Sequence, residues 1–278
     1  MPCLANTEPS ALPLVTAVRH SHETSAKRKI SSKQVAVIGA GKMAEAIIGG
    51  LLRVEAVASH QIVASDINKE RLKYLKDNYS VEVTRDNGAA IKSADLVILA
   101  IKPQSMPHFM PSVCNRFYPG ALIISIVAGY SVQDISVGTG VEAVVRCMPN
   151  TPALVGKSMT VWTCNGGVAE KQKLETQAVL GSFGAELFVA DEEYLNMATA
   201  LSGTGPAYFF MIMEAMIDTG VHMGFPREMA KMLVLKTIEG TAQLALVSGN
   251  HPASLRNDIT SPGMHAYLYR FPFVFIYI

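Results

Sequence analysis

The stretch of sequence that most constrains the fold is the run VAVIGAGKMA at residues 35–44. An apolar segment that ends in Gly39, Ala40 and Gly41 predicts a strand, a tight turn and a helix. Gly39 permits the sharp turn, Gly41 lets the backbone approach phosphates, and Ala44 allows close packing of helix on strand. The free N–H groups at the helix start would face an anion, as in a dinucleotide site. An ordinary strand-to-helix turn is the alternative interpretation.

A second apolar segment at residues 61–66 supports the dinucleotide interpretation, because it ends in Asp66, about 20 residues beyond the glycine turn. A carboxylate at this place binds ribose hydroxyls. It favours NAD over NADP, since a 2′-phosphate would meet like charge. Asn68, Lys69 and Arg71 follow closely, and they either bind that phosphate or form the solvated start of the next helix. The choice of cofactor therefore stays open at this point.

Apolar runs continue along the first part of the chain and predict further strands. They lie at residues 81–83, 96–100, 122–127, 143–147, 159–164 and 186–189. Near-continuous apolar runs are typical of strands that are covered on both faces. The predicted fold class is α/β, with a doubly wound, mostly parallel sheet.

From residue 191 onward the pattern is helical. The expected helices span residues 192–200, 206–223, 226–247 and 252–257. The helix from residue 206 is apolar on nearly all faces, so it requires burial on all sides. Its methionines are expected in a buried core or a dimer interface, with a ligand groove as the alternative. We expect an all-helical second domain that associates with a copy of itself.

The composition fits these two domains and excludes several classes of partner. A chain of 278 residues is long enough for two cores, and its net charge of +1 gives no electrostatic argument for nucleic acid or an anionic membrane. No apolar run reaches the roughly 20 residues that span a bilayer. The four cysteines show neither metal-ligand nor paired spacing, which indicates reduced thiols. The predicted segments are a disordered extension at 1–32, a dinucleotide-binding domain at 33–190, a helical domain at 191–263 and an atypical tail at 264–278.

Residues that directly follow the predicted strands are candidates for the site, because the carboxyl ends of parallel strands face the ligand crevice. Lys102 is placed to approach cofactor or substrate, or it is a solvated lysine before a helix that begins with proline. Ala128 and Gly129 are small enough to let a nicotinamide ring lie flat. Asn150 and Thr151 lie in a proline-bounded loop, where their side chains can form hydrogen bonds to a ligand. The alternative is that this loop has only a structural role.

Two polar, glycine-containing turns occur later in the chain. LSGTGP at residues 201–206 predicts a loop that binds an anion through N–H groups, or a well-capped helix start. DITSPG at residues 258–263 is the second turn. The seven histidines form no metal-binding spacing and have no evident nucleophile partner, so a hydrolase is not expected.

Six segments in order carry a family resemblance: VIGAGKMAEAI, AIKP, SIVAG, RCMPNTPALVG, LSGTGPAYFF and LRNDITSPG. Over residues 33–263 they strongly resemble pyrroline-5-carboxylate reductases. The first two segments also occur in β-hydroxyacid dehydrogenases, whereas PNTP followed by LSGTGPAY and DITSPG is specific to the pyrroline-5-carboxylate reductase family. The resemblance implies an N-terminal Rossmann domain and a C-terminal helical domain that interleaves with a partner subunit, in homodimers or rings of dimers. It implies hydride transfer from NADPH, with NADH as the alternative, to a cyclic imino acid, giving L-proline. The unpaired cysteine spacing predicts the cytoplasm. A plastid or mitochondrion is the alternative if residues 1–32 are a transit peptide.

The resemblance also assigns site residues by position. The implied cofactor contacts are Gly39, Ala40, Gly41, Lys42, Met43, Asp66, Asn87, Ala100, Ile101, Lys102 and Ala128. The implied substrate or domain-junction residues are Glu192, Asp258, Ser261 and Gly263. Lys102, Asn150 and Ser261 are the expected catalytic residues, and no metal is expected.

After Gly263 the sequence departs from the family. The family continues with glycine, a variable residue and threonine, which hold the substrate, and then with two more helices. Here Ala266 stands at the threonine position, and residues 264–278 form an aromatic, β-prone run. We therefore expect a truncated helical domain and weak or absent activity. A non-catalytic dinucleotide-binding remnant that pairs with full-length subunits is the alternative.

Overall fold

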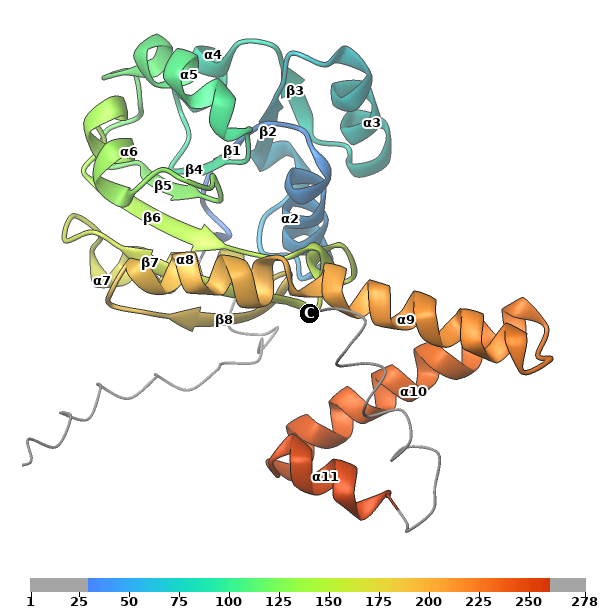
Figure 1. The fold of residues 1–278 in the computed structure, drawn as a ribbon. Coiled ribbons are helices and arrows are strands. Elements are labelled where there is room, and N and C mark those ends of the chain that lie inside the picture. Colours follow the sequence, from blue (N-terminus) through green and yellow to red (C-terminus); the bar gives the residue numbers. More distant parts are fainter. Residues whose placement is uncertain (1–29, 261–278) are drawn as a thin grey trace, which may run out of the picture. The chain divides into compact units, whose positions relative to one another are not determined.

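The computed structural model describes residues 30–260 and separates the chain into two compact units, divided between Pro206 and Ala207. The first unit contains the sheet and the helices around it (Figure 1). The second unit contains helices alone within the described residues. The predicted domain boundary between residues 190 and 191 stays a prediction.

Eight strands form one sheet in the described part of the chain, in the spatial order β3-β2-β1-β4-β5-β6-β7-β8. They are β1 (Val35–Ile38), β2 (Ile62–Ser65), β3 (Glu82–Thr84), β4 (Leu96–Leu99), β5 (Leu122–Ser125), β6 (Ala143–Met148), β7 (Ser158–Cys164) and β8 (Gly184–Phe188). Neighbouring strands pair in parallel, except that β6 and β7 are antiparallel. The predicted doubly wound, mostly parallel sheet is confirmed. Its strand order reverses between β1 and β4, where such sheets bind ligands.

Helices cover both faces of the sheet (Figure 1). One face carries α2 (Lys42–Arg53), α3 (Lys69–Tyr79) and α7 (Glu170–Gly181), and the other carries α4 (Asn87–Ile91), α5 (Met106–Val113) and α6 (Val132–Thr139). Successive side chains of a strand point to opposite faces, so Val35 and Val37 join the first apolar core while Ala36 and Ile38 join the second. Burial on both faces explains the continuous apolar runs in the sequence.

The first unit ends in a wide helical turn that the sequence did not predict. α8 (Glu193–Ala198) packs on β7 through Leu195, and the chain then continues as a π-helix at Thr199–Gly203. The expected loop at 201–206 is therefore wrong. The N–H of Thr204 donates to the carbonyl of Thr199 at 2.9 Å, and the hydroxyl of Ser202 donates to the carbonyl of Ala198 at 3.0 Å. These bonds keep the glycine-containing segment helical, and π-helical turns often occur at functional sites.

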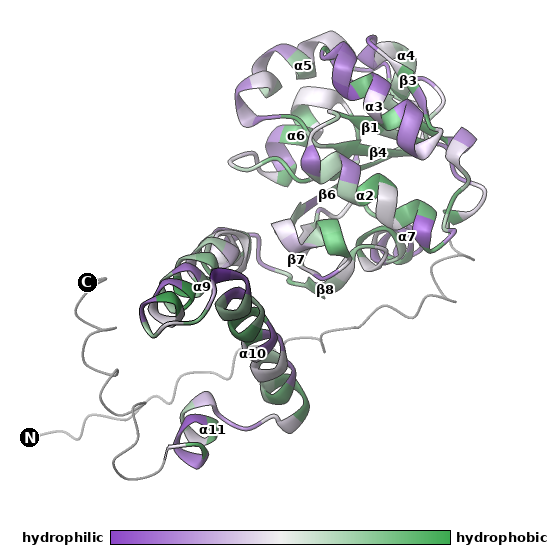
Figure 2. Cartoon of the chain, turned by 90° about the vertical axis from the view of Figure 1, so that its right-hand side faces the viewer, coloured by the Kyte–Doolittle hydropathy of each residue, from purple (hydrophilic) through white to green (hydrophobic). Residues whose placement is uncertain are grey.

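The remaining helices are α9 (Gly205–His222), α10 (Arg227–Ser248) and α11 (Pro252–Asp258). The expected burial of α9 on all sides is not found within one chain, since the side chains of Phe209 and Phe210 are 57% and 62% exposed. Figure 2 shows apolar stretches along both α9 and α10. A pair of helices covers only the faces that they turn toward each other, so these apolar faces need a further partner. None of the described helices is long and apolar enough to cross a membrane.

Candidate active site

The turn after β1 has the backbone geometry that a pyrophosphate contact requires. Gly39 has a φ of +103°, and an added Cβ would overlap the carbonyl oxygen of Ala100, so glycine is needed there. Gly41 is the N-cap of α2, where no side chain caps the helix and an added Cβ would stand in open space. The first N–H groups of α2, from Lys42 and Met43, therefore lack helical partners and are available to an anion.

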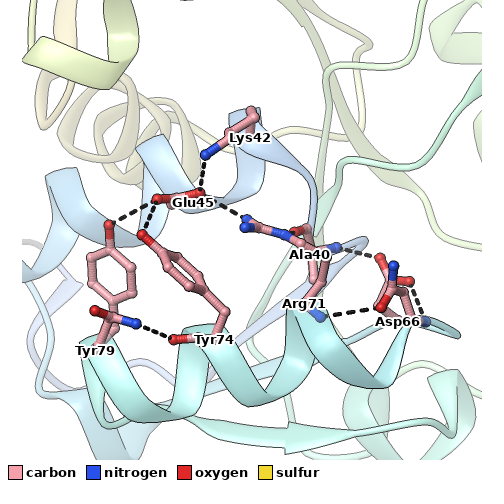
Figure 3. Close-up of polar contacts among 9 residues, drawn as sticks. Ala40, Lys42, Glu45, Asp66, Arg71, Tyr74 and Tyr79 are labelled. Atoms are coloured by element: carbon pink, nitrogen blue, oxygen red, sulfur yellow. Dashed lines mark hydrogen bonds and ion pairs between the residues drawn. The ribbon is translucent and has the colours of Figure 1, made fainter.

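Asp66 follows β2 and lies against this glycine turn (Figure 3). Its Oδ2 accepts the N–H of Ala40 at 2.6 Å, and its Oδ1 accepts the N–H of Asn68 at 2.8 Å. A carboxylate oxygen has two acceptor sites, so both oxygens can still accept ribose hydroxyls. The carboxylate thus fixes the turn, and its predicted contact with the ribose stays a prediction.

Asn87 is held beside the same strand end. It is the first residue of α4, and its Oδ1 accepts the hydroxyl of Ser65, the last residue of β2, at 2.7 Å. Asp86 caps α4 through hydrogen bonds to the N–H groups of Gly88 and Ala89. The cap and the serine together hold the Asn87 amide at the carboxyl end of β2.

The ends of β4 and β5 complete this edge of the sheet. The N–H of Ala100 donates to the carbonyl of Ile38 at 2.8 Å, which keeps the two strand ends in register. Ile101 is half-buried, whereas Lys102 is exposed at the start of a short 3₁₀ turn. Ala128 is exposed in the turn after β5. The parallel register therefore gathers these predicted cofactor residues with the glycine turn at one edge.

Asn150 is fastened in the loop after β6. Its Oδ1 accepts the N–H of Met159 at 3.0 Å and the hydroxyl of Ser158 at 3.1 Å. Its Nδ2 donates to the carbonyl of Ser202, in the π-helical turn, at 3.0 Å. Asn150 therefore ties the proline-bounded loop to β7 and to the π-helical turn, and one amide hydrogen is left for a ligand.

Glu192 precedes α8 and pairs with a buried arginine. Its Oε1 accepts Nη1 of Arg146 at 2.8 Å and the N–H of Val132 at 3.0 Å. Arg146 is 5% exposed, and its Nη2 donates to Oδ1 of Asn196 at 3.3 Å. The pair joins β6, α6 and α8, while Oε2 of Glu192 has no hydrogen-bond partner within residues 30–260. A substrate contact through Oε2 is compatible with this geometry.

A polar cluster between α2 and α3 was not anticipated as a unit (Figure 3). Glu45, on the first turn of α2, accepts hydrogen bonds from Arg71 at 2.8 Å, from Tyr74 at 3.0 Å and from Tyr79 at 3.4 Å, and pairs with Lys42 at 3.4 Å. Burial alone would raise the pKa of Glu45, but the hydrogen bonds from Arg71, Tyr74 and Lys42 hold it below its ordinary value. The carboxylate is therefore ionised although only 7% exposed.

The start of α3 shows where two of the polar residues after Asp66 lie, while their predicted contact with a 2′-phosphate stays a prediction. Asn68 caps α3 by accepting the N–H groups of Glu70 and Arg71 through its side chain. Arg71 is not a freely solvated residue, because its Nε donates to the carbonyl of Ala40 and its Nη2 to Glu45, both at 2.8 Å. It is thus held at the glycine turn.

The predicted substrate residues of the last turn belong to the second unit or lie outside the described residues. Asp258 is exposed at the end of α11, in the second unit. Ser261 and Gly263 lie outside the described residues. Their predicted contacts with substrate stay predictions.

Two other types of chemistry find no support in the geometry. Within residues 30–260 no group of three or more histidine, cysteine or acidic side chains could hold a metal ion. Cys147, on β6, is buried, and its Sγ donates to the carbonyl of Ser125 at 3.4 Å. Burial raises the pKa of this thiol to about 12, so it is not a nucleophile at neutral pH.

The residues present fit a nicotinamide dinucleotide. The uncapped start of α2 suits the pyrophosphate, Asp66 and Asn87 suit the adenosine ribose, and the small residues after β4 and β5 leave room for the nicotinamide half. The sequence missed the contributions of Glu45, Tyr74 and Arg146. Their partners are far away in the chain, and no local pattern signals them.

Comparisons with known proteins agree with both halves of the fold. A family model described as pyrroline-5-carboxylate reductase dimerisation matches residues 192–265. A model described as NADP oxidoreductase coenzyme F420-dependent matches residues 34–129. Pyrroline-5-carboxylate reductase of Pseudomonas aeruginosa is 40% identical over 234 residues, which cover 84% of this chain and 85% of that protein.

Solved structures show the same likeness. A pyrroline-5-carboxylate reductase from Coxiella burnetii has a TM-score of 0.75 at 30% identity, covering 86% of this chain and 88% of that one. The Plasmodium falciparum pyrroline carboxylate reductase, solved with NADP bound, has a TM-score of 0.80 at 26% identity, covering 88% of this chain and 90% of that one.

Proposed function

The chain belongs to the pyrroline-5-carboxylate reductase family, and we propose that it reduces L-1-pyrroline-5-carboxylate to L-proline with a reduced nicotinamide dinucleotide. The observation that carries this proposal is the uncapped glycine turn at the switch point of a doubly wound sheet, in a chain that also matches the dimerisation model of this family. The non-catalytic alternative has no observation of its own in its favour.

In the proposed reaction, the nicotinamide supplies a hydride to the C=N carbon, whose electrophilicity comes from a protonated ring nitrogen. The protein then has mainly to position the two reactants. We assign Lys102 to attract the substrate carboxylate, because it is an exposed cation at the end of β4. Asn150 is assigned to hold the loop beside the substrate. Ser261, Gly263, Asp258 and Oε2 of Glu192 are assigned to the imino acid by family resemblance.

We propose NADPH as the preferred hydride donor, with NADH as the weaker one. The Plasmodium falciparum relative was solved with NADP bound, which supports the phosphorylated cofactor. Arg71 supplies a guanidinium at the ribose end of the glycine turn. Asp66 opposes a 2′-phosphate through its charge, so the preference is expected to be moderate.

We also propose that the chain acts as a homodimer or a ring of dimers. Apolar side chains on α9 and α10 are exposed in the single chain, and the dimerisation model of the family covers these helices. The cytoplasm is the proposed compartment, since Cys114, Cys147 and Cys164 are unpaired.

The test is to follow oxidation of NADPH and NADH by the purified chain with pyrroline-5-carboxylate. A second chain, in which residues 264–278 are replaced by the loop and helices of the family, is assayed beside it. Proline formation by either chain supports the proposed reaction, and a rate confined to the rebuilt chain assigns the predicted low activity to residues 264–278. Cofactor binding without turnover by both chains would contradict the proposal and favour the non-catalytic remnant.

A further inference from the structure

The guanidinium of Arg71 is unusually well fixed for a residue on the outside of a Rossmann-type unit (Figure 3). Its Nε donates to the carbonyl of Ala40 at 2.8 Å, and its Nη2 donates to Glu45 at 2.8 Å. Its Cζ lies 4.8 Å from the ring centre of Tyr74, within the range of a cation–π contact. Three contacts therefore hold one side chain in one place.

One edge of this guanidinium is not occupied by a hydrogen bond within residues 30–260. Nη1 of Arg71 has no hydrogen-bond partner among residues 30–260, and the side chain is 26% exposed. A planar guanidinium offers its donors in a fixed fork, which suits the oxygens of a phosphate group. The remaining edge is thus accessible and already oriented.

The position of this edge follows from the peptide group of Ala40. The N–H of Ala40 is bound by the carboxylate of Asp66, and its carbonyl is bound by Arg71. An acid and a guanidinium therefore bracket one peptide of the glycine turn. Because Asp66 stands where an acid binds the ribose hydroxyls, Arg71 lies at the same end of the crevice.

Glu45 is the group that keeps Arg71 there. It belongs to the helix that begins at the glycine turn, and it is only 7% exposed. The hydroxyls of Tyr74 and Tyr79 bind its other oxygen, so the carboxylate itself has little freedom to move. An unpaired arginine side chain would lose more conformational entropy when it binds a ligand.

We propose that Glu45 is a specificity-determining residue that positions Arg71 to bind the 2′-phosphate of NADP(H). This inference rests on the proposed function only in that the chain binds a nicotinamide dinucleotide. Glu45 acts through Arg71 and does not itself touch the cofactor. Its loss should therefore weaken binding of NADP⁺ and leave binding of NAD⁺ unchanged.

The test is to measure dissociation constants of NADP⁺ and NAD⁺ for the full chain by isothermal titration calorimetry, without substrate. Arg71→Met should weaken NADP⁺ about 10- to 100-fold, the size expected for a charged hydrogen-bonded pair, with NAD⁺ within about twofold. Glu45→Ala should weaken NADP⁺ about 5- to 10-fold through the lost positioning of Arg71, again without effect on NAD⁺.

Two conservative variants separate positioning from general damage. Glu45→Gln keeps an oxygen that accepts from Arg71, so NADP⁺ affinity should return to within about threefold of the original. Lys76→Met, at an exposed cation near the end of α3, serves as the matched control, with both constants unchanged. Arg71→Lys keeps the charge without the fork, and it should weaken NADP⁺ and spare NAD⁺.

The proposal is overturned if Glu45→Ala weakens both cofactors equally, or if it tightens NADP⁺, since Glu45 would then be a purely structural group or a repelling charge. If Glu45→Ala does not fold, the two Arg71 variants decide: equal effects on both cofactors contradict the proposal. A chain that binds NADP⁺ as described but does not reduce pyrroline-5-carboxylate would refute the proposed function and leave this inference standing.

Discussion

Helices α2 and α9 show how differently the two units are stabilised. Seven of the twelve residues of α2 are buried, whereas α9 has eighteen residues and Gly205 is the one among them that is buried. Both sequences are apolar, so hydropathy alone does not distinguish them. The difference teaches that an apolar pattern shows which surface must be covered, but not which chain covers it. Four predictions test this contrast, beginning with the largest effect.

The sheet unit should depend on its own core at any protein concentration. Ile98, in the middle of β4, is fully buried, and Ile98→Ala should lower the free energy of unfolding by about 2–5 kcal/mol through lost burial and a cavity. Urea unfolding measures this loss. Val137→Ala, at a residue that is 70% exposed on α6, is the control and should change little. Equal free energies of unfolding of the two variants would contradict the prediction that the sheet unit depends on its own buried core.

The helical unit should instead depend on a second chain. Phe210→Ala removes a side chain that is 62% exposed in the single chain, so its cost should appear as weaker self-association, about 2 kcal/mol or 30-fold in the dimer dissociation constant. Sedimentation velocity over a range of concentrations measures it. If the chain stays monomeric at every concentration, with or without Phe210, the predicted dependence of the helical unit on a second chain is wrong.

Variants of Asn150 test how far its side chain stabilises the π-helical turn at the end of the first unit. Asn150→Leu loses the hydrogen bonds with Ser158, Met159 and Ser202, and should cost about 2 kcal/mol of stability. Asn150→Asp keeps the acceptor for Met159 and loses the donor to Ser202, so about half of that loss is expected. Hydrogen exchange at the amide of Thr204 should accelerate in both variants. Unchanged exchange would show that the π-helical turn holds by itself.

The smallest expected effect is a pH dependence within the sheet unit. The pKa of Glu45 lies below 4.5 in the folded protein, so the unfolded chain binds its proton more readily. The stability that Glu45 contributes is therefore present above about pH 4.5 and is lost as the pH falls through its folded pKa. Glu45→Gln should flatten this acid limb by about 1 kcal/mol or less, because its partners are partly exposed. Unfolding curves between pH 6 and pH 3 check this, and an unchanged slope would contradict it.

The sequence predicts features that depend on neighbouring residues. The strand expected at 159–164 is found at Ser158–Cys164, and the glycine turn forms where the fingerprint stands, because both follow from local periodicity and local sterics. The helical pattern after residue 191 is also local. Only the form of 199–203 differs, since hydroxyl-to-carbonyl bonds favour a wide turn over a loop.

Side-chain contacts between residues far apart in the chain could not be predicted from the sequence. Glu45 and Arg71 are separated by 26 positions, and Asn150 and Ser202 by 52. Periodicity carries no information about which polar side chains meet across two elements. For Arg71, the residue type allowed two interpretations, and its contact with Glu45 could not be predicted from the neighbouring residues.

Cys147 has a practical consequence for measuring how this sheet moves. Its thiol is buried in the first apolar core, so a thiol reagent can reach it only in molecules in which that core has opened. Cys114 and Cys164 are partly exposed and should react in the folded protein. After the fast phase, the rate at which Cys147 is labelled therefore reports how often this apolar core opens.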